Sequence, residues 1–307
     1  MDLTPNEDQA ALQSATADWC RDNMPLEHCR NRAGTLWTEL EAMGCTGMTA
    51  AGMELDHASE ALVFAELGRF LAPIGLLSTA VARRWFKESA KGKVALALTG
   101  SAPATLRVLD PPASKMVLIA EAARLTLLDL PDAGADGDGA RHVPRAPTID
   151  LSTLQSRRER AGAEWTADDP AAPLHLQLLS AAFAVGCADA ARDMAADYAK
   201  LREQFGRPIG WFQSLKHMCS DMAVRAAAAR SELYYAACAL DENAADAAFH
   251  VAAAKRLADQ AALDNGRANI QVHGGVGMTD EAAAHLPLKR AHLLQFVMPA
   301  SREALLA

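Results

Sequence analysis

Residues 201–217, LREQFGRPIGWFQSLKH, interrupt two long runs of small apolar residues. One run covers residues 174–204 and the other residues 211–240, so each overlaps one end of this stretch. Both runs are rich in Ala and have the apolar spacing of long α-helices. Gly206 and Pro208 favour a break, because glycine and proline are the residues that helix interiors tolerate least. The stretch therefore predicts two long helices joined by a polar, aromatic elbow.

The chain divides into three zones that differ in composition and in the spacing of their apolar residues. Residues 1–91 have helical spacing, with Thr4 as the expected cap of the first helix. Residues 92–170 hold short apolar runs such as VALALT and KMVLIAE, separated by Pro, Gly and Asp, which predict about five short strands. Residues 171–307 return to long helices. We expect a mostly α fold with an N-terminal helical domain (1–91), a shortened β-domain (92–170) and a C-terminal four-helix bundle (171–307).

Two local features add detail to this outline. The Gly-, Asp- and Ala-rich stretch 132–141 predicts a surface hairpin or a mobile loop. The last helical segment, residues 279–296, is expected to begin at a Thr279 cap and to be interrupted by Pro287.

The composition argues against several classes of function. A formal charge of -8 and a pI of about 5.6 provide no basic field for nucleic acid or an anionic membrane. The acidic, polar N-terminal residues do not resemble a signal peptide, and no apolar run reaches the roughly 18 residues of a membrane span. The six cysteines have no CxxC pair and no metal-ligand spacing. We expect a cytoplasmic protein with buried, reduced thiols and no metal site.

Two C-terminal motifs carry a resemblance to a known family. LREQFGRPIGWFQSLKHMCSDM (201–222) and NIQVHGGVGMTDE (269–281) resemble motifs of the acyl-CoA dehydrogenases, and LWTELEAMGCTGMT (36–49) and LGRFLAPIGLLSTA (67–80) resemble that family's N-terminal helical domain. The resemblance covers nearly the whole chain. It implies the fold of that family, an FAD cofactor and the α,β-desaturation of an acyl-CoA.

The resemblance implies a role for each residue of the elbow. Arg202 offers a forked, permanently charged donor for the pyrophosphate of FAD, Phe205 an aromatic wall, and Gln213 a neutral hydrogen-bonding group. His217, one turn after Gln213, is expected to face the same side. Together these four residues would clamp the cofactor.

Other interpretations of the elbow residues remain open. Arg202 could pair with Asp197 or Glu203 on a solvated face, while Phe205 and Trp211 could belong to the core. His217 could be an ordinary histidine of the bundle.

Gln271, Gly274 and Gly275 form the second motif. They resemble a loop that reaches across a dimer interface to the FAD of the neighbouring subunit. Glycines there let backbone N–H groups approach phosphates without a Cβ in the way. Taken alone, GGVG would indicate no more than a helix end and a turn.

The resemblance fails at the catalytic base. Most relatives carry a Glu about twenty residues after the double glycine, where this chain has Met298, and a minority carry it near the start of the first long C-terminal helix, where Leu176 or Gln177 stands. Neither a thioether, an alkyl group nor an amide can remove a proton from carbon. The β-domain also lacks the Thr/Ser-Asn-Gly-like stretch that holds the flavin ring in relatives.

These departures suggest a division of labour between two chains. We interpret the protein as the short, base-less subunit of an α2β2 acyl-CoA dehydrogenase of the type that acts on bulky sterol or bile-acid side chains. A full-length subunit would supply the Glu, and an electron-transfer flavoprotein would accept the electrons.

Two alternatives follow from the same residues. One is a homo-oligomeric flavin enzyme of this fold with another base, such as His273, Asp280 or Glu281, although the two acidic residues after Thr279 most simply lie at a helix N-terminus. The other is a non-catalytic homologue that binds FAD or a partner for assembly.

Overall fold

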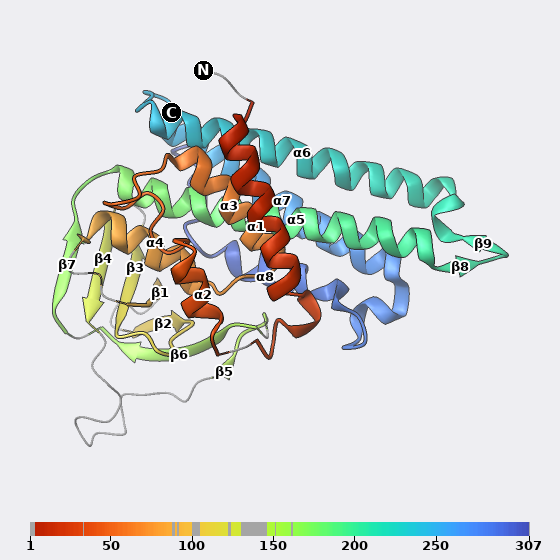
Figure 1. The fold of residues 1–307 in the computed structure, drawn as a ribbon, viewed down its shortest axis with the longest axis horizontal. Coiled ribbons are helices and arrows are strands. Elements are labelled where there is room, and N and C mark those ends of the chain that lie inside the picture. Colours follow the sequence, from red (N-terminus) through yellow and green to blue (C-terminus); the bar gives the residue numbers. More distant parts are fainter. Residues whose placement is uncertain are drawn as a thin grey trace.

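The computed structural model describes residues 4–32, 34–87, 90, 92–99, 105–121, 124–129, 146–150, 152–160 and 162–306. In these residues helices come first, a β-sheet second and long helices last, which is the order that the sequence predicts (Figure 1). The predicted hairpin or loop at 132–141 lies outside the described residues. The domain boundaries at residues 91 and 170 remain a prediction.

Four α-helices precede the sheet, and α1 and α5 both pack on α3. Their bounds, with one 3-10 helix, are α1 (Glu7–Asn23), η1 (Leu26–His28), α2 (Leu36–Ala42), α3 (His57–Arg69) and α4 (Gly75–Trp85). Asn6 caps α1, since its Oδ1 accepts from the backbone N–H of Gln9 at 2.8 Å and Gln9 Oε1 accepts from the N–H of Asn6 at 3.1 Å. The prediction of a Thr4 cap is wrong, because Asn6 is the residue that directly precedes the first helical turn.

A seven-stranded sheet with the order β5-β6-β2-β1-β3-β4-β7 follows these helices. The strands are β1 (Val94–Thr99), β2 (Thr105–Leu109), β3 (Met116–Glu121), β4 (Arg124–Asp129), β5 (Ala146–Pro147), β6 (Leu154–Glu159) and β7 (Glu164–Ala167). β1 and β3 run parallel, and the other neighbours are antiparallel. The expectation of about five strands was too low, because β6 (LQSRRE) and β7 (EWTA) lack apolar alternation and β5 has two residues.

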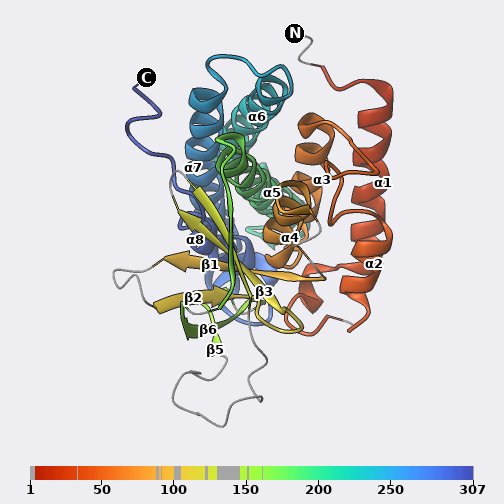
Figure 2. The same ribbon diagram turned by 90° about the vertical axis from the view of Figure 1, so that its left-hand side faces the viewer.

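Alternate residues of the strands serve two different clusters. Leu96, Leu118 and Leu127 belong to the main core, which also contains the helices. Val108 and Val117 belong to a separate cluster on the other face of the sheet. Figure 1 shows the strands toward one end of the long helices, and Figure 2 shows α1 to α4 beside them.

Three long helices dominate the second half of the chain. The elements there are α5 (Ala171–Leu201), β8 (Glu203–Gln204), β9 (Arg207–Pro208), η3 (Ile209–Trp211), α6 (Gln213–Asp241), α7 (Ala247–His273), η4 (Gly274–Met278), η5 (Ala283–His285) and α8 (Leu286–Leu294). α5, α6 and α7 pack on one another, and α8 packs on α5 and α7 as a short fourth helix. The predicted helical bundle is confirmed (Figure 1).

The end of the bundle sequence differs from its prediction. α8 begins at Leu286 with Pro287 in its first turn, so Pro287 starts this helix and does not interrupt it. A proline is tolerated there because the N–H that it lacks would have no partner within the helix. No helix begins at Thr279, whose Oγ1 donates to Val276 O at 2.9 Å.

α3 and α5 cross at two glycines. A Cβ at Gly186 would overlap the backbone oxygen of Ala65, and a Cβ at Gly68 would overlap the backbone of Phe183. Both positions therefore need glycine, because this close approach leaves no room for a side chain.

Among the described residues, α5 alone has the length and composition of a membrane span. The sequence analysis expected no such run. However, 89% of the apolar window in α5 is buried inside the protein, where α3, α6 and α7 cover it. The apolar surface of α5 is thus occupied by the core of the bundle.

The six cysteines are free thiols. Four are buried as predicted, but Cys219 and Cys238 on α6 are partly exposed. Burial, the largest effect on both groups, raises the pKa of Cys20 and Cys187 to about 12, so these thiols stay protonated at neutral pH.

A buried ion pair connects the helices to the sheet. Arg290 of α8 is 1% exposed and donates through Nε to Asp150, which follows β5. Its other nitrogens donate to Ala72 O at 2.7 Å and to Leu71 O at 3.3 Å, in the turn between α3 and α4. Burial alone would raise the pKa of Asp150, but the Arg290 guanidinium outweighs it and lowers that pKa below its ordinary value. One arginine therefore joins three distant segments of the chain.

We expect Arg290→Met to destabilise the protein by about 3–5 kcal/mol, because Asp150 would remain buried without a counter-charge. Urea denaturation at neutral pH measures this loss. The matched control is Arg21→Met, whose pair with Asp18 is exposed and should change the free energy of unfolding very little. Equal effects of the two substitutions would contradict the role given to Arg290.

Candidate functional site

The elbow forms a short hairpin at the far end of the bundle (Figure 1). β8 pairs with β9 through Glu203–Pro208 and Gln204–Arg207, and the turn between them consists of Phe205 and Gly206. Both turn residues have left-handed backbone angles, with φ values of 55° and 76°. This matches the turn that two-residue hairpins favour, but a left-handed Phe costs about 1–2 kcal/mol.

The elbow side chains point into solvent. Phe205 is 87% exposed and Trp211 is 63% exposed, so the interpretation that they belong to the core is wrong. Arg202 is also exposed, and in the part of the chain that the structure describes its side chain makes no hydrogen bond or ion pair. Asp197 pairs with Lys200 at 2.9 Å, so the alternative partner of Arg202 on that helix is already taken.

Gln213 and His217 lie together in the first turns of α6. Gln213 Nε2 donates to His217 Nε2 at 3.0 Å, and both side chains are exposed. The expected common orientation of the two residues is present. Their contact with a cofactor remains a prediction.

The glycine motif lies at the same end of the bundle. α7 ends at His273, whose ring stacks on Tyr198 of α5 with 4.1 Å between centroids. Gly274 has a φ of 66°, and nothing lies within 4 Å of where a Cβ would stand at Gly274 or Gly275. Gln271 is exposed one turn earlier. The end of α7 therefore presents open backbone beside the end of α5, as a phosphate-binding loop requires.

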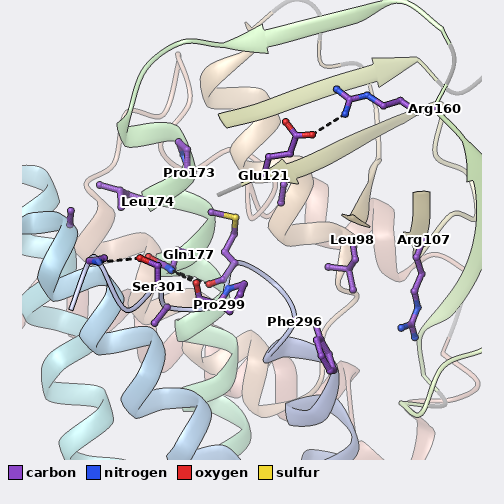
Figure 3. A pocket seen from close by; sticks show the side chains of 15 residues that line it. Leu98, Arg107, Glu121, Arg160, Pro173, Leu174, Gln177, Phe296, Pro299 and Ser301 are labelled. Atoms are coloured by element: carbon purple, nitrogen blue, oxygen red, sulfur yellow. Dashed lines mark hydrogen bonds and ion pairs between the residues drawn. The ribbon is translucent and has the colours of Figure 1, made fainter. Parts of the chain in front are cut away.

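A cavity of about 770 Å³ lies at the opposite end of α5, between that helix, the sheet and the chain that follows α8 (Figure 3). Gln177 and Met298, from the two segments where the sequence analysis looked for a base, both line it. Gln177 Nε2 donates to Met298 O at 3.0 Å and to Pro299 O at 3.3 Å. Leu176 is fully buried in the core beside them. The fold thus brings two positions that are distant in sequence to one wall.

Among the described residues that line this cavity, Glu121 is the one carboxylate. One of its oxygens pairs with Arg160 at 2.9 Å and the other with Arg124 at 3.3 Å. A carboxylate between two guanidinium groups is a poor base, because the positive charges favour its ionised form. Among the described residues that line the cavity, none is therefore suited to removing a proton from carbon.

The other candidate bases lie elsewhere. His273, Asp280 and Glu281 do not line the cavity. Asp280 pairs with Arg30 at 2.8 Å, and Arg30 lowers the pKa of this carboxyl. The expectation that Asp280 and Glu281 begin a helix is wrong, because η5 starts two residues later, at Ala283.

The two halves of the candidate site are far apart within one chain. Gln177 and Arg202 lie near opposite ends of α5, separated by about 38 Å at the helical rise of about 1.5 Å per residue. One extended flavin dinucleotide cannot reach from the elbow to the cavity of the same chain. An elbow and a cavity that share a cofactor must come from two chains.

The sequence analysis missed the sheet wall of the cavity. Leu98, Arg107 and Ala120 face it from β1, β2 and β3, and Phe296 closes it from beyond α8. The strands were predicted, but the pairing that brings these residues into one row is not visible in a single sequence.

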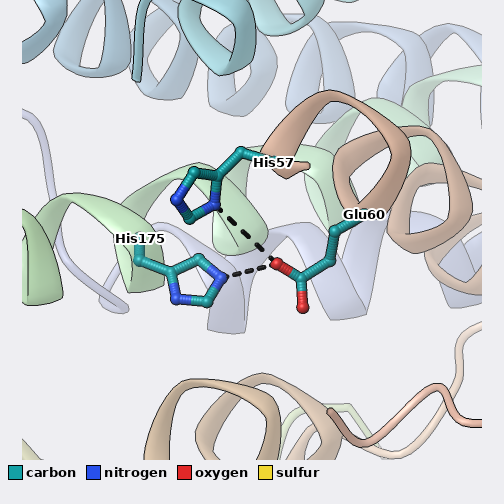
Figure 4. A group of neighbouring side chains, drawn as sticks. All are labelled: His57, Glu60 and His175. Carbon is teal, nitrogen blue, oxygen red and sulfur yellow. Dashed lines mark hydrogen bonds and ion pairs between the residues drawn. The ribbon is translucent and has the colours of Figure 1, made fainter. Parts of the chain in front are cut away.

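A second polar group lies in the core (Figure 4). His57 and Glu60 of α3 and His175 of α5 place their potential ligand atoms within 4.8 Å of one another. Trp85 Nε1 donates to His175 Nδ1 at 3.1 Å, so the proton of this imidazole lies on Nε2, which donates to Glu60 Oε2 at 2.6 Å. A metal ion would need the lone pair on Nε2. The group is therefore better described as a hydrogen-bond network between α3, α4 and α5.

His57 lies beside this network without a hydrogen bond at Nδ1, which is buried. Its ring lies edge-on to His175 at 4.7 Å. Burial, with smaller contributions from His175 and Arg84, lowers the pKa of His57 from 6.5 to about 2. This imidazole is neutral in the folded state at every physiological pH.

Three comparisons place this geometry among known proteins. The family described as Acyl-CoA dehydrogenase, C-terminal domain, matches residues 175–297. Acyl-CoA dehydrogenase IpdE2 of Mycobacterium tuberculosis (strain ATCC 25618 / H37Rv) is 36% identical to this chain, over 99% of this chain and 96% of its own length.

Two solved structures are similar in fold. A chain of the ChsE4-ChsE5 complex from Mycobacterium tuberculosis aligns with a TM-score of 0.75 at 23% identity, over 97% of this chain and 95% of its own. A chain of the Tcur3481-Tcur3483 steroid ACAD aligns with a TM-score of 0.77 at 21% identity, over 98% of this chain and 96% of its own. At these identities the likeness shows the fold alone.

The buried His57 predicts a loss of stability in mild acid. The unfolded chain binds a proton at His57 below about pH 6.5, whereas the folded chain does not, so the folded state loses about 1.4 kcal/mol per pH unit below that point. Between pH 7.5 and 5.5, urea denaturation should show a smaller loss for His57→Gln than for the wild type, by about 1 kcal/mol. His28→Gln, at an exposed histidine, is the control and should keep the wild-type slope. Identical slopes for all three proteins would refute the assignment.

Proposed function

The chain belongs to the acyl-CoA dehydrogenase family, and we propose that it is the subunit without a catalytic base in a heteromeric, FAD-dependent member. The observation that carries this proposal is the cavity that Gln177 and Met298 line, because Met298 stands at one expected base position and Leu176 or Gln177 at the other. Removal of an α-proton needs a carboxylate in a desolvated pocket, where its pKa can rise. A partner, a full-length acyl-CoA dehydrogenase subunit, would supply that carboxylate in an α2β2 assembly.

The length of α5 supports the sharing of cofactors between chains. The elbow at Arg202 and the cavity at Gln177 are separated by about 38 Å of helix. An elbow that holds a flavin must therefore serve the ring pocket of a neighbouring subunit. In the proposed assembly, this chain contributes its elbow to the site in which the partner carries the base.

The elbow fits the dinucleotide half of FAD. Arg202 would pair with the pyrophosphate, and Phe205 would cover the bound dinucleotide from the hairpin tip. Gly274 and Gly275, open where a Cβ would stand, would let backbone N–H groups reach the adenosine side, with Gln271 beside them. Bound FAD supplies the acceptor for the hydride that leaves the β-carbon of the substrate. The residues of this chain bind and orient the cofactor and exclude water from it, and they take no proton.

We assign the substrate to bulky acyl-CoA thioesters of the steroid side-chain type. The likeness in fold to the Tcur3481-Tcur3483 steroid ACAD and to the ChsE4-ChsE5 complex supports this assignment and the heteromeric assembly. We further propose an electron-transfer flavoprotein as the acceptor and the cytoplasm as the compartment, the latter because all six cysteines are free.

Flavin content and mass test the proposal first. We expect the lone chain to bind little FAD, because its elbow needs the pocket of another subunit. Co-expression with the full-length relative should give a yellow tetramer by visible absorbance and light scattering. That tetramer should bleach when a steroid side-chain acyl-CoA is added.

Two results would support the alternatives. If the lone chain is yellow, homo-oligomeric and active, another residue of this sequence acts as the base. That result would support the homo-oligomeric flavin enzyme. A flavin-containing tetramer that no acyl-CoA reduces points to the non-catalytic homologue.

Arg202→Gln should weaken FAD binding by the tetramer about 10- to 100-fold, since a charge-assisted pair with phosphate is lost. Flavin released on dilution measures the affinity. Lys200→Gln is the control, because it removes a neighbouring exposed cation that pairs with Asp197. If both substitutions release flavin equally, Arg202 has no specific role.

Glu121→Gln tests for a hidden base in the cavity of this chain. We expect the tetramer to keep its kcat, because Glu121 is held by Arg124 and Arg160. A fall of about 10²–10⁴ in kcat, typical of the loss of a general base, would show that this chain does perform the proton transfer.

A further inference from the structure

One row of residues crosses four strands and floors the cavity. Ala120 of β3 pairs with Leu98 of β1, Leu98 pairs with Arg107 of β2, and Arg107 pairs with Arg157 of β6. Partners in register share a face of the sheet. Since Ala120, Leu98 and Arg107 line the cavity, Arg157 continues their row at its edge. The floor is therefore apolar at one end and ends at Arg107, with the charge of Arg157 next to it just outside the lining.

No carboxylate of the described chain neutralises these two arginines. Arg107 donates through Nε to the neutral amide of Gln155. Arg157 is exposed and makes no hydrogen bond or ion pair with any described residue. Like charges directly opposite each other on neighbouring strands destabilise a sheet. This arrangement therefore has a cost that a bound anion would offset.

Arg160 shows that the pattern is specific. It also lines the cavity, but it pairs with Glu121 at 2.9 Å and with Glu164 at 2.9 Å. Among the described residues, two carboxylates thus pair with this cavity arginine, and none pairs with Arg107 or Arg157.

The size and the lining of the cavity are also those of a ligand site, although no base lines it among the described residues. Its volume of about 770 Å³ is within the range of sites for small molecules. Leu174, Phe296 and Met298 add apolar walls to the floor. A mainly apolar space of this size with a few placed charges is typical of a ligand site.

We propose that this cavity is a non-catalytic binding site for an amphipathic anion, whose apolar body lies on Leu98 and Ala120 and whose carboxylate or phosphate is held by Arg107 and Arg157. The site goes beyond the proposed function, in which the chemistry takes place in the partner's pocket. Two ligands carry this chemistry: a carboxylate at the end of an apolar body, and the phosphates of a CoA thioester.

Isothermal titration of the FAD-containing tetramer tests the proposal with three probes of equal chain length. Decanoate carries a carboxylate, decanoyl-CoA carries phosphates, and decanamide carries neither. Ala120→Phe fills the floor of this cavity alone, so the binding that disappears in this variant belongs to this chain and not to the partner.

We expect Arg107→Gln and Arg157→Gln each to weaken that component about 10- to 100-fold for an anionic probe and to leave decanamide unaffected. Loss for decanoate identifies a carboxylate ligand, and loss for decanoyl-CoA alone identifies the phosphates. Arg124→Gln, an arginine of the same sheet that pairs with Glu121, is the matched control and should bind as the wild type does.

Two results would overturn the proposal: anionic probes that bind no better than decanamide, or arginine variants that bind as the control does. Neither result affects the proposed function, because flavin content and flavin reduction by an acyl-CoA are measured separately on the same tetramers.

Discussion

The ion pair between Arg290 and Asp150 is the interaction on which the geometry of the cavity depends. It is buried, and its arginine also holds the turn between α3 and α4 through backbone carbonyls. α8 leads directly into the segment with Phe296 and Met298, while Asp150 leads into β6 with Arg157. One guanidinium therefore fixes both walls of the cavity relative to the N-terminal helices. A neutral pair could fill the same space, but it would not fix these directions as tightly.

α5 sets the second constraint, which is one of length. Its first turns carry the cavity wall, and its last turn carries the elbow. Because the helix is continuous, the distance between the two cannot shorten when a ligand binds. An interaction between the elbow and a ring pocket must therefore be made between chains. The glycine crossing with α3 brings the two helices close together, and most of the apolar window of α5 is buried.

Local chemistry in the sequence predicted the parts of the structure that depend on neighbours along the chain. Apolar spacing predicted the long helices, and Gly206 and Pro208 predicted their break. Features that depend on pairing could not be predicted: the row from Ala120 to Arg157 exists only through the register of four strands. The same holds for Glu60 and His175, which are distant in sequence and meet in the core. The prediction of the cap of α1 was wrong for a local reason. Thr4 and Asn6 are both residue types that cap helices well, and the geometry of the first turn decides between them.

The exposed hairpin tip has a consequence for the cell. Leu201, Phe205 and Trp211, at the hairpin and on either side of it, each expose a large apolar side chain to solvent. In the proposed assembly, a copy made in excess of the partner would keep these side chains uncovered, which favours aggregation and capture by chaperones and proteases. The abundance of the chain would then follow that of its partner, through degradation of the unassembled copies. Synthesis of the two chains in equal amounts, from one transcript for example, would avoid the degradation of unassembled copies.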